Sequence, residues 1–313
     1  MSFSYETKNE LCKLPVQKLC CARAEAYGIL LYCNTFNSTE VRIITENPQF
    51  AARLPKLFQR AFGIRFDRQP EPDQVGKRVF QILDQKKLDH IINTLGYDPR
   101  QNLVLHINFA MLEDECCRAA FLRGAFFGGG SVTDPVKRYH LEMTSSHLQA
   151  SRELEVLLRE CGYPPKNIAR NGSFITYFKQ SDQIEDFLTL IGAPVAAMHI
   201  MSTKLEKDLR NSVNRRLNCD SANLDKAVQA AQEQLEAIRT LEAADVLKDL
   251  PDKLKQTAVL RLENPELTLT ELAEVFDPPV TKSCLNHRLR KLTSMAKTIK
   301  ENKEEEETDH ESV

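Results

Sequence analysis

An internal repeat constrains the fold of this chain more than any single motif does. The segment CCARAEAYGILL, which starts at Cys20, aligns with CCRAAFLRGAFF, which starts at Cys116. Two further blocks follow in the same order in both copies: VRIIT is matched by YHLEMT, and LDHIINTLG by IEDFLTLIG. Chance alignment of apolar helices is the alternative, but three ordered blocks favour a duplicated structural unit.

Each copy is predicted to run in the order helix, two strands, helix, two strands, helix, because its hydrophobic periodicity changes in that order. The expected elements are apolar helices at about 20–32 and 116–128, first strands at VRIIT and YHLEMT, amphipathic helices at 48–62 and 146–161, further strands around 77–83 and 173–179, and short helices that end at Gly96 and Gly192. This order indicates an α+β fold with antiparallel sheets. The two repeats, at about 20–98 and 116–195, form a predicted domain of residues 1–196.

Gly28 and Gly124 occupy equivalent positions in the two apolar helices, where glycine costs about 1 kcal/mol relative to alanine. Small residues allow two helix backbones to approach closely. We therefore predict that these helices pack against each other at the two glycines, across a pseudo-two-fold axis. The glycine run at 128–130 is interpreted as a tight exit from the second helix, or as room for a phosphate backbone.

A repeated glycine-bearing helix in an αββαββα unit resembles the LAGLIDADG homing-endonuclease fold. The segments AYGILLYCN and LRGAFFGGG lie on the LAGLIDADG motif. In that family the last aspartate of each motif holds a divalent metal at the DNA backbone, and the matching positions here are Cys33 and Gly129. No Asp or Glu occurs in 26–39 or in 118–133. Because Mg²⁺ requires hard oxygen ligands, we predict no enzyme activity, no catalytic residue, no metal and no cofactor, with an active endonuclease as the less favoured alternative.

The nine cysteines include two adjacent pairs, Cys20-Cys21 and Cys116-Cys117, and no CxxC motif or Cys/His cluster with zinc spacing. They are interpreted as reduced thiols that act as small apolar side chains. No apolar run reaches the roughly 18 residues that a membrane helix needs, and the first residues, MSFSYETKNELCK, do not read as a secretory signal. A cytoplasmic protein with no membrane partner is therefore expected. The net charge of −2 gives no global indication of a nucleic-acid partner.

The C-terminal third is predicted to hold a linker at 197–223, a small all-α domain at 224–300 and an acidic disordered tail at 301–313. Within the domain, a helix-turn-helix pattern extends from about Thr268 to Lys300. The second helix of the domain, which is the first helix of the helix-turn-helix motif, is expected to start near Thr270 as the cap and to bury Leu272, Ala273 and Phe276. After the turn DPPV, the third helix is expected to start near Thr281 or Ser283 and to bury Leu285, Leu289 and Leu292.

The third helix has a basic face: residues 280–300 contain six Lys or Arg and no acid. Arginine can bind guanine and asparagine can bind adenine through paired hydrogen bonds, whereas Lys and Ser suit phosphate. A solvated basic helix is the alternative interpretation. The predicted DNA-binding residues are Thr281, Lys282, Ser283, Asn286, His287, Arg288, Arg290 and Lys291. Four phosphate contacts from this set predict a log–log salt slope of about −3.6.

Taken together, these segments resemble the WhiA family of Gram-positive bacteria, which joins a degenerate LAGLIDADG-like domain to a C-terminal helix-turn-helix. The resemblance rests on SFSYETKNEL, FLRGAFFGGGSVTDP, NRRLNCDSANLDK and KSCLNHRLRKL. It implies a regulator that binds double-stranded DNA on the nucleoid and acts in cell division, chromosome segregation or transcription of sporulation genes. A further likeness to sigma-factor modules suggests RNA polymerase or a partner regulator as a contact, and a protein-interaction scaffold is the alternative function. Oligomeric state stays open.

Overall fold

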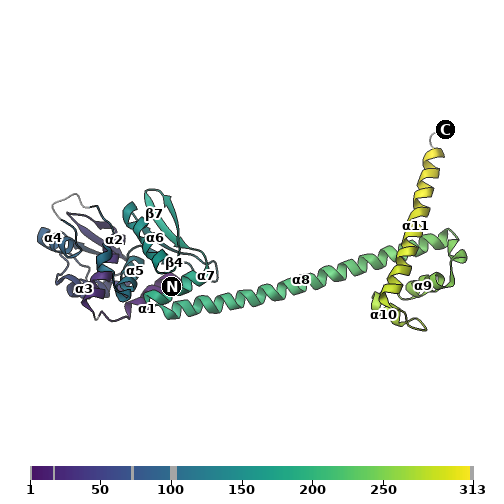
Figure 1. Cartoon of the computed structure of the whole chain (residues 1–313), viewed down its shortest axis with the longest axis horizontal. Helices are drawn as coiled ribbons and strands as arrows, with labels where there is room; N and C mark the ends of the chain where they lie inside the picture. Colours follow the sequence, from purple (N-terminus) through teal and green to yellow (C-terminus); the bar gives the residue numbers. More distant parts are fainter. Residues whose placement is uncertain (1, 17, 72–73, 99–103, 311–313) are drawn as a thin grey trace. The chain divides into compact units, whose positions relative to one another are not determined.

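The computed structural model describes residues 2–16, 18–71, 74–98 and 104–310 (Figure 1). The chain separates into two compact units, Met1–Asp208 and Leu209–Val313. Among the described residues, no helix is both long enough and apolar enough to span a membrane.

The first unit begins with helix α1 (Phe3–Cys12) and then contains the two copies of the repeat. The elements of the first copy are α2 (Leu19–Tyr32), β1 (Thr35–Phe36), β2 (Val41–Thr45), α3 (Pro48–Phe62), β3 (Arg78–Ile82) and α4 (Gln85–Thr94). After a short 3-10 helix η1 (Phe109–Met111), the second copy contains α5 (Glu115–Gly129), β4 (Gly130–Val132), β5 (Leu141–Ser145), α6 (Leu148–Glu160), β6 (Lys166–Arg170), β7 (Ser173–Phe178) and α7 (Ser181–Ile191).

Each copy forms one antiparallel sheet, which confirms the predicted duplicated α+β fold. The strand order is β1-β2-β3 in the first sheet and β4-β5-β7-β6 in the second. The predicted second pair of strands is present as β6 and β7 in the second copy, whereas among the described residues between α3 and α4 of the first copy β3 is the one strand, with an isolated bridge between Arg68 and Gln81. Pro70 follows this bridge, and proline has no amide hydrogen with which to extend a ladder. The prediction of two strands there is therefore wrong for the first copy.

The two copies share one hydrophobic core, and helices α2 and α5 run through it. Seven consecutive residues of α2, from Ala26 to Tyr32, are all buried, because the sequence there is apolar on every side of the helix. Aromatic contacts cross between the copies: Phe50 stacks on Phe127 with ring centroids 4.6 Å apart, and Tyr27 meets Phe121 at 5.4 Å. Neither copy therefore encloses its core alone.

The predicted close contact between the glycine-bearing helices is confirmed. A Cβ atom placed on Gly28 would lie 2.1 Å from the carbonyl oxygen of Phe121, and one on Gly124 would lie 2.0 Å from the carbonyl oxygen of Glu25. Any side chain at either position would overlap backbone of the opposite helix. The cost of glycine within each helix is thus offset by contact between the two helix backbones.

A buried ion cluster fixes the same helix pair. The Glu25 carboxylate accepts hydrogen bonds from Arg53 Nε at 2.6 Å and Nη2 at 2.9 Å, and from Arg123 Nε at 2.9 Å. Arg53 lies on α3 of the first copy and Arg123 on α5 of the second. Glu25, which is 1% exposed, has its charge balanced by both arginines, so the cluster joins the two copies through hydrogen bonds as well as apolar contacts.

The second unit contains part of helix α8 (Pro194–Ala243), the 3-10 helix η2 (Val246–Asp249), and helices α9 (Asp252–Glu263), α10 (Leu269–Glu274) and α11 (Lys282–His310). Residues 197–223, predicted as a linker that precedes the helical domain, are helical throughout and continuous with the residues that follow. No Gly or Pro occurs between Val195 and Leu250 to interrupt the helix.

The acidic segment after Lys300 also differs from its prediction as a disordered tail, because α11 continues to His310. Glutamate supplies five of the ten residues at 301–310, and glutamate is a strong helix former. The last part of the predicted tail, residues 311–313, lies outside the described residues.

Candidate nucleic-acid interface

Helix α10 begins with a capping box at Thr268. The Thr268 hydroxyl accepts from Glu271 N at 3.4 Å, and the Glu271 carboxylate accepts from Thr268 N at 2.9 Å. These hydrogen bonds hold the pKa of the Glu271 carboxyl below its usual value. The predicted cap at Thr270 is therefore wrong by two residues. The correct signal was present in the sequence as the spacing Thr-x-x-Glu.

Thr281 caps helix α11, whose start was predicted near Thr281 or Ser283. Its hydroxyl accepts from Cys284 N at 3.2 Å. In the preceding turn, Val280 N donates to the carbonyl oxygen of Ala273 at 3.1 Å. This bond ties the turn to α10, so that the start of α11 is held by the helix before it.

The orientation of α11 is set by its apolar side. Leu285, Leu289 and Leu292 are buried as predicted, and Ala296 continues the same stripe. They pack in one core with the end of α8, with α9 and with α10. The other members of this core are Ala237, Ile238, Leu241, Leu250, Leu254, Ala258, Leu272, Ala273 and Phe276.

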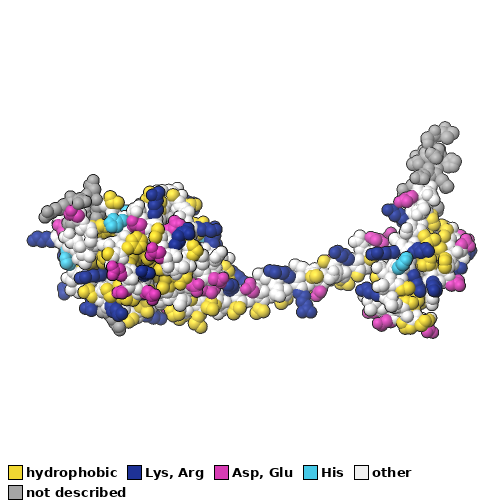
Figure 2. Space-filling view, viewed as in Figure 1, with side chains coloured by type: hydrophobic (Ala, Val, Ile, Leu, Met, Phe, Trp, Pro, Cys, Tyr) yellow, Lys and Arg dark blue, Asp and Glu magenta, His cyan; other side chains and the backbone are white. Residues whose placement is uncertain are grey.

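The opposite side of α11 carries most of the predicted DNA-binding side chains. Figure 2 shows Lys and Arg side chains gathered over this part of the second unit. The exposed members of the predicted set are Thr281, Lys282, Ser283, His287, Arg290 and Lys291. Because an α-helix turns 100° per residue, Ser283, His287 and Arg290 follow one another along the centre of the exposed face.

Two members of the predicted set lie at the edges of this face. Asn286 and Arg288 are half-buried, on opposite flanks of the helix. The Arg288 guanidinium lies 5.6 Å from the centre of the Phe276 ring, so part of its side chain packs on the turn that follows α10. The structure therefore divides the eight predicted residues into an exposed group and two flanking residues.

The motif ends of α2 and α5 hold no carboxylate. The Cys33 thiol donates to the carbonyl oxygens of Leu30 and Thr35, each at 3.2 Å, and burial raises its pKa to about 12. A Cβ atom on Gly129 would lie 2.3 Å from the carbonyl oxygen of Thr144. Cys33 is thus a neutral thiol at neutral pH, and Gly129 has no room for a side chain.

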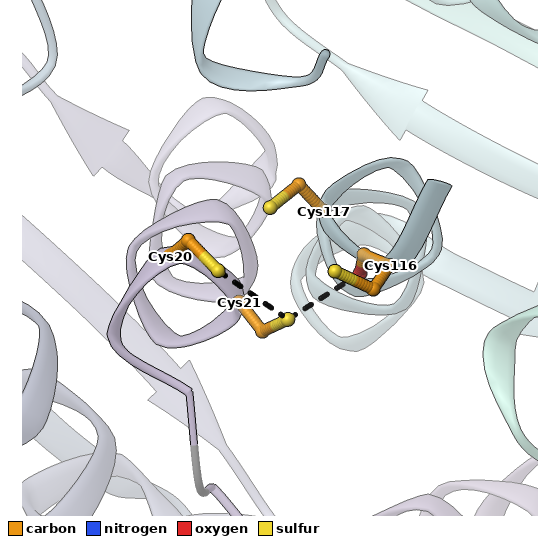
Figure 3. Close-up of side chains that lie close together, drawn as sticks. All are labelled: Cys20, Cys21, Cys116 and Cys117. Atoms are coloured by element: carbon orange, nitrogen blue, oxygen red, sulfur yellow. Dashed lines mark hydrogen bonds between the residues drawn. The ribbon is translucent and has the colours of Figure 1, made fainter. Parts of the chain in front are cut away.

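Four cysteines that sequence reasoning treated as separate apolar side chains come together in the first unit. The sulfur atoms of Cys20, Cys21, Cys116 and Cys117 all lie within 4.8 Å of one another (Figure 3). Spacing along the chain could not reveal this group, because the two pairs are far apart in sequence. The signal was in the repeat alignment, which places Cys20 on Cys116 and Cys21 on Cys117, on helices that pack together.

The two units define a class of protein that combines a duplicated LAGLIDADG-like α+β domain with a helix-turn-helix domain. The family model described as the WhiA LAGLIDADG-like domain matches residues 118–210, and that of the WhiA C-terminal HTH domain matches residues 213–296. The chain belongs to the WhiA family.

Relatives and a solved structure agree with this membership. The chain is 36% identical to the probable cell division protein WhiA of Ruminiclostridium cellulolyticum, over 96% of this chain and 99% of the relative. It is 35% identical to the protein of the same name from Alkaliphilus metalliredigens, over 95% and 98%. The crystal structure of full-length DUF199/WhiA from Thermotoga maritima is similar with a TM-score of 0.58 and 22% identity, covering 95% of this chain and 99% of that one, which shows the shared fold.

Proposed function

We propose that this chain is a non-enzymatic regulator that binds double-stranded DNA through its C-terminal helix-turn-helix, with α11 as the recognition helix. The observation that carries the proposal is the exposed basic face of α11, within a domain that matches the WhiA helix-turn-helix family. In helix-turn-helix proteins the second helix of the motif enters the major groove and its N-terminal residues contact base edges. The exposed predicted residues of α11 lie in its N-terminal half, where such contacts are made.

The positions of the side chains suggest separate roles in this proposal. Arg290, at the centre of the exposed face, suits paired hydrogen bonds to a guanine. Lys282 and Lys291 suit phosphates on the two sides of the groove, where they fix position without reading sequence. Asn286 reaches DNA from the flank of the helix, where it suits adenine, and Arg288 supports the face by packing on Phe276.

The proposed cellular role is cell division. It is supported by the names of the relatives, which are called probable cell division proteins. A DNA-binding member of this family would act on the nucleoid in the cytoplasm, through transcription regulation, including a sporulation-type role, or through chromosome segregation. RNA polymerase or a partner regulator is the protein contact that fits a transcriptional role.

We also propose that the protein does not cleave DNA. The support is the lack of any carboxylate at Cys33 and Gly129, the positions that match the metal-binding acids of homing endonucleases. Purified protein incubated with supercoiled plasmid and Mg²⁺ or Mn²⁺ should leave the DNA uncut. Metal-dependent nicking that persists through purification, and is lost from a Gly124→Leu variant, would refute the proposal.

The central test is specific DNA binding by an Arg290→Ala variant. Genome-wide mapping of the wild-type protein supplies a bound site, and fluorescence anisotropy then measures affinity for that duplex. Arg290→Ala should lose about 1–3 kcal/mol of specific binding free energy. The control Arg239→Ala removes an exposed arginine of α8 in the same unit and should change binding little.

The salt dependence of binding separates DNA recognition from a protein-interaction role. Lys282 and Lys291 are the two exposed cations of the face that are assigned to phosphates, so two phosphate contacts predict a log–log slope of about −1.8. This is shallower than the slope for four contacts, because Arg288 packs on Phe276 and Arg290 is assigned to a base. Equal affinity of Arg290→Ala and wild type, together with no dependence on salt, would reject α11 as the DNA reader and favour the scaffold.

A further inference from the structure

The four-cysteine group described above occupies equivalent places in the two copies of the repeat. Cys20 and Cys21 are the second and third residues of α2, and Cys116 and Cys117 are the second and third residues of α5. Figure 3 shows the four side chains converging from the first turns of these two helices. The group lies at the N-terminal ends of the helices, the opposite ends from Cys33 and Gly129.

The distances suit a single tetrahedral metal ion. Zinc–sulfur bonds of about 2.3 Å in a tetrahedron place the sulfurs about 3.8 Å apart. Cys20 Sγ and Cys21 Sγ are 4.0 Å apart, and no pair in the group exceeds 4.8 Å. Side-chain rotation that moves each sulfur by about 1 Å is therefore enough to bring all four thiols to bonding distance. Among the described residues this is the one group of three or more Cys, His, Asp or Glu close enough to share an ion.

Burial raises the pKa of the Cys21 thiol to about 11 and also raises that of Cys117, so the thiolate forms depend on the helix ends and on the bound ion for their stability. The N-terminus of a helix carries partial positive charge from its free amide groups, which stabilises a thiolate in the first turn. Here two helix N-termini meet at one group of sulfurs. An adjoining open pocket of about 300 Å³ is lined by Cys21 and Cys116 together with Lys18 and Arg123. Glu25 lines the same pocket and is paired with Arg123, so Lys18 is the cation there that would offset part of the charge of a tetrathiolate complex, and the pocket gives solvent access.

We propose that Cys20, Cys21, Cys116 and Cys117 form a binding site for one soft, thiolate-preferring divalent metal ion of the zinc class, which clamps the N-terminal ends of α2 and α5. Tetrahedral sulfur sites select Zn²⁺ or iron–sulfur chemistry over Mg²⁺, so this site is chemically distinct from a nuclease metal centre. Binding forms four metal–sulfur bonds and releases one proton from each thiol to solvent. The ion joins the two copies of the repeat, which is a structural role that does not depend on DNA binding.

The test uses full-length protein, reduced and purified without oxygen, with Co²⁺ as a spectroscopic probe and Zn²⁺ as competitor. Wild type should bind one Co²⁺ per chain with a thiolate-to-cobalt charge-transfer band and the strong visible bands of tetrahedral Co²⁺. Zn²⁺ should displace the Co²⁺ and raise the midpoint of thermal unfolding. Outer-shell changes alone cost 10–100-fold in metal affinity, so Cys20→Ser or Cys116→Ser should lower Zn²⁺ affinity by more than about 100-fold.

Matched controls come from cysteines outside the group. Cys219 and Cys284 are exposed, like Cys20 and Cys116, so Cys219→Ser and Cys284→Ser should bind metal as wild type does. Because Cys20 and Cys116 are exposed, their serine variants should keep the wild-type circular dichroism without metal. Absence of the charge-transfer band in reduced wild type, or equal Zn²⁺ affinity of Cys20→Ser and Cys219→Ser, would overturn the proposal. Thiol trapping in cells that recovers a disulfide between α2 and α5 would overturn it as well.

Discussion

The contact between α2 and α5 supports a quantitative prediction for Gly124→Ala. The new Cβ atom would lie 2.0 Å from the Glu25 carbonyl oxygen and 2.9 Å from its carbon. Both atoms belong to backbone, so no side chain can rotate away and the helices must move apart. Overpacking of a core costs about 1–3 kcal/mol, and a clash with backbone places this substitution at about 3 kcal/mol. Alanine also has a higher helix propensity than glycine, which offsets about 1 kcal/mol of that cost. We expect a net loss of about 2 kcal/mol in unfolding free energy.

Tyrosine fluorescence during urea unfolding measures this loss of unfolding free energy in the first unit, Met1–Asp208. The protein has no Trp, and all seven Tyr lie within the first unit, so the signal reports that unit alone. A double variant tests whether the two glycines act through the same helix contact. Once Gly124→Ala has separated the helices, Gly28→Ala should cost less than it does alone, with a coupling energy of at least about 0.5 kcal/mol.

The control for this coupling is Gly63→Ala. Gly63 ends α3 with a φ of 72°, and no atom beyond its two chain neighbours lies within 4 Å of the place that a Cβ atom would take there. Alanine at this position therefore costs only backbone strain, about 1–2 kcal/mol, and its effect should add to that of Gly124→Ala. Unchanged stability of Gly124→Ala, or full additivity of Gly28→Ala with Gly124→Ala, would refute close backbone packing as the reason for the two glycines.

Two further predictions concern other contacts. Glu25→Ala leaves Arg53 and Arg123 without their carboxylate in the core and should lower the unfolding free energy of the first unit by about 3–5 kcal/mol; a loss below about 1 kcal/mol in the same tyrosine assay would contradict the role of the ion cluster. Thr268→Ala removes the cap of α10 and should cost about 1 kcal/mol in the thermal stability of the second unit, measured by circular dichroism. Since the pKa of Glu271 is lowered by Thr268, the contribution of Glu271 is complete above the usual glutamate pKa and is lost as pH falls through the lowered value. A Thr268→Ala variant that keeps the acid dependence of wild type would argue against the capping box.

Elements with a strong local signal were predictable from sequence. The amphipathic helix at 48–62 corresponds to α3 at Pro48–Phe62, because apolar periodicity and the stop at Gly63 are both local. The predicted cap of α10, Thr270, lies two residues after the true cap, Thr268, which the local Thr-x-x-Glu spacing marks. The missing strand of the first copy and the continuous α8 were not predicted, because both depend on how far a ladder or a helix propagates beyond its local signal.

The sequence by itself determined that the fold is duplicated, that glycines face each other between paired helices, and that the motif positions Cys33 and Gly129 lack acids. These conclusions follow from residue identity and order along the chain. Tertiary structure alone decided that Cys20, Cys21, Cys116 and Cys117 share one place, and that Arg288 is half-buried against Phe276. The physical reason is that packing brings together side chains distant in sequence, whereas spacing within a single segment shows only which face of a helix a residue occupies.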